Sequence, residues 1–182
     1  MPSILDTTKQ FWNILNMYPD IHSPQLQERI STFVIHADVN AFFQMQKGLF
    51  DFAVPYFLED ERISALMCGL DGRKIGLSIE REYQSTLIFR PDGFDMIWGI
   101  KRGYPVFTVV SREAYRDGIL RREDPLKLVL TRKLKIKRLA TLARWALPYW
   151  HIFIDDTLYE KFLGYQDDVE GWINDELTRL GY

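Results

Sequence analysis

The chain has 182 residues, of which 47% are hydrophobic and 26% charged, with a net charge of −2, and this composition fits one globular domain that needs no metal or disulfide to hold its core. Its single cysteine, Cys68, excludes an intramolecular disulfide and a cysteine metal cluster, and its apolar neighbours predict plain core packing for the thiol. No stretch approaches the roughly 18 apolar residues of a membrane span, and the N-terminus does not resemble a signal peptide, so a cytoplasmic location is expected.

The first 60 residues predict helices. One is expected over residues 6–18, and a second begins at Ser23-Pro24, where a capping side chain precedes a proline at the first helical position. Asp38 is expected to cap a third helix, closed by Gly48. Residues 50–57, which contain a proline, predict a short helix or a turn.

The central part of the chain predicts strands. Residues 74–80 alternate apolar and polar side chains, as expected of a strand with one buried face. Asp71-Gly72 is a strong hairpin signal, which suggests that the apolar residues before it also form a strand. Residues 91–93 predict a turn, and residues 94–99 lead towards the next strand. The predicted strands cover residues 62–70, 74–80, 84–90, 106–110 and 134–137.

Helices are expected again towards the C-terminus. Ser111 caps a predicted helix over 112–122, and Asp124-Pro125 starts a short one. A helix over 139–150 should kink or end at its internal proline. Residues 155–180 predict an acidic helical extension, anchored by Tyr159, Phe162, Trp172 and Leu177.

Three stretches within residues 62–147 resemble the sterol-carrier-protein-2 (SCP2-like) family. Gly69–Ile75 resembles its first hairpin, and Val109–Ile119 its strand followed by a Ser-x-Glu/Asp-x-aromatic helix. The most specific stretch is Asp124–Lys137, which resembles the Asn/Asp-Pro helix that leads into a Lys-Leu-Lys-Ile-Lys strand. One departure is Arg138, which stands where the family usually has glycine and makes a left-handed backbone less expected there. The family's Phe-Phe pair in the short helix is also missing.

The resemblance implies an α+β fold with a five-stranded, mostly antiparallel sheet covered by helices. We therefore expect a helical segment over 1–60, an SCP2-like core over 61–153 and an acidic helical extension over 154–182, together forming one compact domain. In family members that bind a ligand, an apolar tunnel between sheet and helices holds fatty acyl chains, sterols or other lipids. The fold alone does not determine the function.

Such a tunnel would take its walls from apolar side chains of the central region. In the helix from Leu139 to Leu147, small alanines beside Trp145 leave room for a ligand, although the same helix could simply fill the core. The same two interpretations apply to each candidate wall residue: Met67, Leu87, Phe89, Phe107, Leu130, Ile136, Leu139, Leu142, Trp145 and Ala146.

Basic side chains are concentrated in the middle of the chain. Residues 1–61 carry 3 basic and 8 acidic side chains, residues 62–153 carry 18 and 9, and residues 154–182 carry 2 and 8. Either the acidic ends pack on the basic centre and neutralise it, or the centre attracts an anionic surface or ligand. The densest run of basic residues consists of Arg132, Lys133, Lys135, Lys137 and Arg138. Two interpretations are open: it is a solvated edge strand that its lysines protect from aggregation, or it contacts an anionic membrane or a phosphate-bearing head group.

Signals for catalysis are weak. His22, His36 and His151 lack metal-ligand spacing, and no nucleophile elbow or phosphate-binding loop is present. We therefore expect no enzyme activity, no metal and no cofactor. Three hypotheses remain: intracellular binding or transfer of a fatty acid, acyl-CoA, sterol or other lipid; a non-catalytic module that binds a protein partner or a second copy; and a subunit of an enzyme that acts on a lipid-like substrate. Binding of nucleic acid is not expected, because no recognition motif accompanies the charge.

Overall fold

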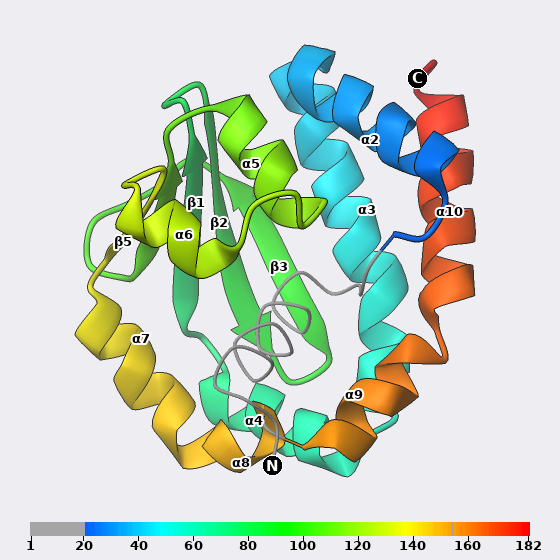
Figure 1. Cartoon of the computed structure of the whole chain (residues 1–182). Coiled ribbons are helices and arrows are strands. Elements are labelled where there is room, and N and C mark those ends of the chain that lie inside the picture. The colour runs from blue at the N-terminus through cyan, green and yellow to red at the C-terminus, as the bar shows by residue number, and fades with distance from the viewer. Residues whose placement is uncertain (1–20, 154) are drawn as a thin grey trace.

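A computed structural model describes residues 21–153 and 155–182 (Figure 1). It confirms the α+β class and the five-stranded sheet. The helix predicted over residues 6–18 lies outside the described residues. Within the described part of the chain, no helix is both long and apolar enough to span a bilayer.

The sheet is mixed and has the order β3-β2-β1-β4-β5. β1 pairs antiparallel with β2 and parallel with β4, and the two remaining pairings, β2 with β3 and β4 with β5, are antiparallel. The strand at residues 94–99, expected only as a link, is the edge strand β3, so the predicted number of strands is right although one member differs. The strands are β1 (Lys74–Ile79), β2 (Tyr83–Arg90), β3 (Gly93–Trp98), β4 (Val106–Val109) and β5 (Leu134–Lys137).

The predicted strand at 62–70 is wrong, because this segment is the helix α4 (Glu61–Leu70). The buried residues Ile63, Leu66, Met67 and Leu70 follow the three-to-four spacing of a helix face. Asp71-Gly72 therefore turns the chain from α4 into β1, and the first hairpin lies at residues 80–82. The same geometry places Cys68 on the outer side of α4, where it is exposed rather than part of the core.

Two helices precede α4. In α2 (Pro24–His36) the Ser23 side chain accepts a hydrogen bond from the Leu26 backbone, which confirms the predicted cap. Asp38 caps α3 (Val39–Leu58) in the same way. Gly48 was predicted to end this helix, but it lies inside the helix. A β-carbon at Gly48 would lie 2.9 Å from the Trp172 ring, so the glycine serves a close helix–helix contact instead of a helix end.

The helices after β4 follow the prediction closely. They are α5 (Arg112–Ile119), α6 (Pro125–Leu130) and α7 (Leu139–Ala146), after which a 3₁₀ turn (Leu147–Tyr149) and α8 (Trp150–Phe153) continue the chain. The expectation for Arg138 is wrong: its φ of 58° and ψ of 39° are left-handed. The turn from β5 into α7 requires this conformation, and an arginine adopts it at a cost of about 1 kcal/mol relative to glycine.

The tail forms α9 (Asp156–Leu163) and α10 (Gln166–Arg179). In Figure 1, α10 runs beside α2 and α3, on the opposite side of the molecule from α6, β5 and α7. The Arg29 guanidinium donates to the Tyr182 backbone oxygen, and the Tyr165 hydroxyl donates to Glu59 at 2.6 Å. The N-terminal helices also pack on the centre, α2 on α5 and α3 on β3, and Arg62 pairs with both Asp60 and Asp155. The expectation that the acidic ends pack on the basic centre is therefore met in part, although the basic residues of β5 and its turns lie on the other side of the molecule.

Candidate ligand-binding cavity

A cavity of about 330 Å³ lies between one face of the sheet and the helices that cover it. Its lining comes from all five strands and from α2 to α7, with one residue of α10. The sheet contributes alternate residues, such as Leu77 of β1 and Leu87 of β2, because successive side chains of a strand point to opposite faces. The opposite face is partly covered by the segment 99–105, where Thr86 hydrogen-bonds to Gly99 and Tyr104.

The hollow separates two groups of buried side chains. One group joins α2, the first half of α3 and α5, and the other joins the second half of α3 with α4 and α9. Leu77, Leu87 and Phe107 lie in central strands beneath helices, yet each remains only half-buried. A tightly packed interior would bury such positions fully, so their accessible area belongs to the cavity wall.

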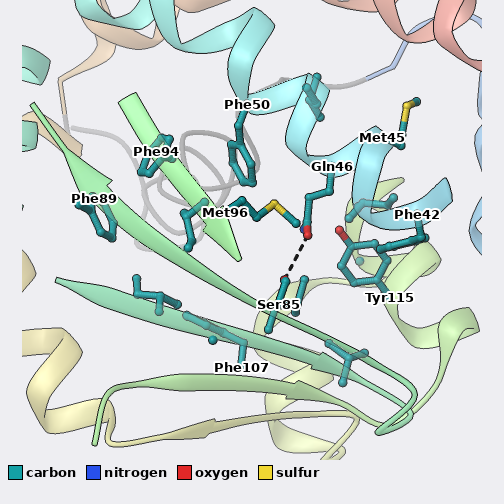
Figure 2. A pocket seen from close by; sticks show the side chains of 18 of the residues that line it. Phe42, Met45, Gln46, Phe50, Ser85, Phe89, Phe94, Met96, Phe107 and Tyr115 are labelled. Atoms are coloured by element: carbon teal, nitrogen blue, oxygen red, sulfur yellow. Dashed lines mark hydrogen bonds between the residues drawn. The ribbon is translucent and has the colours of Figure 1, made fainter. Parts of the chain in front are cut away.

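The polar side chains in the lining gather at one place, shown in Figure 2. Gln46 points from α3 to the sheet, where the Ser85 hydroxyl donates to its Oε1 at 3.3 Å. The Tyr83 hydroxyl, buried behind the wall, donates to the same oxygen. The Tyr115 hydroxyl of α5 lies beside the Gln46 amide. We call Gln46, Tyr83, Ser85 and Tyr115 the polar cluster.

The polar cluster is uncharged near neutral pH. Burial raises the pKa of Tyr115 to about 12, against the opposing hydrogen bond from Gln46. Burial likewise raises the pKa of Tyr83 far above its ordinary value, and the Ser85 hydrogen bond only partly opposes this. Both phenols therefore keep their protons, and none of the lining residues that the structure describes is acidic, basic or histidine.

Most of the predicted wall residues line the cavity, but three do not. Leu130 is 74% exposed, because Leu128 is the buried side chain of the short helix α6 and Leu130 lies at its end. Leu139, in the first turn of α7, is 56% exposed, and Ile136 lies beside Phe107 without lining the hollow. Those that do line it are Met67, Leu87, Phe89, Phe107, Leu142, Trp145 and Ala146.

The polar cluster and the contribution of the N-terminal helices to the cavity wall were not predicted from the sequence. Phe42, Met45, Gln46 and Leu49 all line the cavity and follow helical spacing along α3. A glutamine on an otherwise apolar helix face is the signal that could have identified this position, since a buried polar side chain needs partners.

The basic residues predicted to meet a head group lie on the outer surface and not at the cavity. Lys135 and Lys137 are exposed on β5, and Arg132 and Arg138 on the adjacent turns. Lys133 pairs with Glu123 at 2.6 Å. Arg132, Lys135, Lys137 and Arg138 form no ion pair with any other residue in 21–153 or 155–182. Among those same residues, no three His, Cys, Asp or Glu side chains converge to hold a metal ion.

These features define the class of the protein: an α+β domain with a five-stranded mixed sheet and an apolar cavity beneath its helices. No protein-family model matches the chain, and no curated protein matches it. A solved structure described as a UbiJ-SCP2 ubiquinone synthesis protein is similar over 68% of this chain and 93% of that chain, with 9% sequence identity and a TM-score of 0.38. At this identity the likeness concerns the fold alone.

Proposed function

We propose that this protein binds an apolar small molecule in the cavity and carries it. The observation that supports the proposal is the hollow of about 330 Å³ whose wall is almost entirely aliphatic and aromatic. Each methylene group that moves from water into such a site contributes about 0.8 kcal/mol, so a hydrocarbon chain of about a dozen carbons binds by burial alone. A sterol ring system supplies a similar apolar surface.

The cavity volume favours one compact ligand or a single hydrocarbon chain over a lipid with two chains. Small-molecule pockets span about 300–1,000 Å³, and the cavity lies near the lower limit of that range. Within the proposed function, a fatty acyl chain, a sterol or another single-chain lipid fits better than a diacyl phospholipid.

We propose binding without chemistry at this cavity. Among the described residues that line the cavity, only Tyr115 has a side chain with a titrating oxygen. A pKa of about 12 keeps that oxygen protonated and therefore a poor base or nucleophile at neutral pH. The alternative of an enzyme subunit would require the reacting groups to come from another polypeptide.

Native mass spectrometry of the protein, purified gently from cells, tests the proposal. We expect a mass above that of the polypeptide, and extraction with organic solvent should release an apolar compound of matching mass. The extracted protein should then take up Nile red, a neutral fluorescent dye. A bare polypeptide mass together with no uptake of Nile red would contradict the proposal and favour the alternative of a protein-interaction module.

A second surface suggests where a ligand is exchanged. Exposed apolar side chains lie on α6, α7, the 3₁₀ turn and α8: Leu126, Leu130, Leu139, Leu147 and Trp150. The basic residues of β5 and its turns lie among them in the chain, and Figure 1 places α6, β5 and α7 together on one side of the molecule. Apolar side chains that insert between lipids, surrounded by lysines and arginines, suit an anionic bilayer, to which each cation adds about 1 kcal/mol. We propose that this surface docks on anionic membranes.

Sedimentation with vesicles tests the membrane proposal. The protein should bind vesicles of phosphatidylcholine with 30% phosphatidylserine more strongly than pure phosphatidylcholine, and added salt should weaken the binding. Replacing both Lys135 and Lys137 by glutamate should reduce it more than tenfold, whereas the same change at Lys47 and Lys161, on other faces, should have little effect. Equal binding to both vesicle types, or none, would refute membrane docking and leave a protein partner as the occupant.

A further inference from the structure

The polar cluster contains a hydroxyl proton, on Tyr115, that its internal hydrogen bonds do not use. The Gln46 carbonyl oxygen already accepts from Tyr83 and Ser85. The Tyr115 hydroxyl lies beside the Gln46 amide, whose influence opposes the rise in the pKa of this phenol, and its proton has no hydrogen-bond acceptor among the residues that the structure describes. Because Tyr115 lines the hollow, this proton is available to an oxygen atom of a bound molecule.

The surroundings of the polar cluster decide which oxygen suits it. Of the two basic groups on α5, the Arg112 guanidinium is held by the backbone oxygens of Val34 and Ala37 at the end of α2, and Arg116 pairs with Asp117 at 2.7 Å. Arg73 lies over the Trp145 ring, 5.0 Å from its centroid, at the part of the wall formed by α7. An ionised carboxylate at the polar cluster would be removed from water with no cation among the lining residues that the structure describes, which is strongly unfavourable. A hydroxyl or carbonyl oxygen carries no such cost and gains a hydrogen bond.

We propose that the ligand is an uncharged amphiphile whose single hydroxyl or carbonyl oxygen binds at Gln46, Ser85 and Tyr115, while its hydrocarbon part fills the rest of the cavity. This inference rests on the proposed function and narrows it: alcohols, sterols, ketones and esters are accepted, and carboxylates of the same length are disfavoured. The rival arrangement places an anionic head group beside Arg73.

A displacement experiment separates the two arrangements. Nile red is bound to the full-length protein at pH 8, where dodecanoate is ionised, and is displaced by 1-dodecanol or by dodecanoate. We expect dodecanol to displace the dye at a concentration at least tenfold below that of dodecanoate. Tyr115→Phe removes the free hydroxyl proton and keeps the ring, so it should weaken dodecanol about fivefold while leaving dodecanoate unchanged. Arg73→Gln should change neither competitor.

Dodecanoate that binds as well as dodecanol, or loses affinity in Arg73→Gln, would place the head group at the other end of the cavity. Equal weakening of both competitors by Tyr115→Phe would reduce the role of this residue to packing. A protein that binds Nile red but shows either result retains the proposed function and loses only this inference, whereas failure to bind Nile red and both dodecyl compounds would remove the proposed function as well.

Discussion

Filling the cavity from its floor should stabilise the protein and block its ligand. Leu87 lies in the middle of β2, faces the hollow and is only half-buried. Leu87→Phe adds three carbon atoms at this point and suits a strand, where aromatic residues are favoured. The added atoms enter space that is already inside the molecule, so no neighbour has to move.

The expected size follows from the number of added carbons. At about 0.8 kcal/mol for each buried carbon, Leu87→Phe should raise the free energy of unfolding by up to about 2 kcal/mol. The same three carbons exclude about three methylene groups of a ligand, so Nile red or dodecanol should bind about 50-fold more weakly. Urea denaturation measures the first quantity, and a fluorescence titration measures the second.

A matched control lies next in the chain. Ile88 is on the opposite face of β2 and is 8% exposed, outside the cavity lining. There Ile88→Phe adds the same number of carbons to a packed region and should lower the free energy of unfolding by about 1–3 kcal/mol, without direct effect on the ligand. If Leu87→Phe destabilises the protein as much as Ile88→Phe does, the hollow is absent and the argument for a carrier fails with it.

Three further predictions concern the scaffold. The Arg62 hydrogen bond lowers the pKa of the Asp60 carboxyl from 3.8 to about 2, so the carboxylate stabilises the folded state by about 2 kcal/mol above pH 4. Asp60→Asn keeps the helix cap but loses this contribution. The difference in unfolding free energy between wild type and variant, measured in urea, should therefore shrink as the pH falls from about 4 towards 2. A difference independent of pH would contradict the lowered pKa of Asp60. Arg138→Gly should be more stable than Arg138→Ala by about 1 kcal/mol, because both remove the charge and only glycine adopts φ = 58° freely; equal stability would show that the turn is not left-handed. Leu158→Ala, at a fully buried position of α9, should lower the free energy of unfolding by about 2–5 kcal/mol. Leu163→Ala on the same helix, where the side chain is 38% exposed, should lower it much less in the same urea titration. Similar losses for the two variants would show that α9 does not pack on the core as described.

Local patterns predicted much of the fold because they report on one face of one element. The strand at 74–80 and the caps at Ser23, Asp38 and Ser111 are each decided within a few residues, and the structure confirms them. The single buried face expected of this strand is wrong, because Gly76 and Ser78 on its other face are buried too. The segment 62–70 failed for the opposite reason. A short apolar run fits a strand or a helix equally well, and the choice between them depended on the helix cap at Asp60 and on contacts made elsewhere in the fold.

The candidate site was less predictable than the fold, because a cavity is defined by what the side chains leave empty. Leu87 and Leu130 look alike in the sequence, yet one forms the floor of the hollow and the other is 74% exposed. Gln46 and Tyr115 are separated by most of the sheet in the sequence and meet only because α3 and α5 cover the same face. No spacing rule links such residues before the topology is known.

The ends of the chain determine whether the central region can hold a ligand at all. The resemblance to SCP2-like domains covers residues 62–147, but Phe33 and Phe42 of the N-terminal helices and Ile173 of α10 are part of the cavity wall. The tail also carries Leu158 and Leu177, which have no exposed surface. Removing residues 155–182 would therefore expose the cavity and the core together, so a truncated chain that fails to bind a protein partner would say little about an interaction surface. Point substitutions inside the complete chain, of which Leu87→Phe is the sharpest, distinguish a carrier from an interaction module because they alter the hollow and leave the outer surface unchanged.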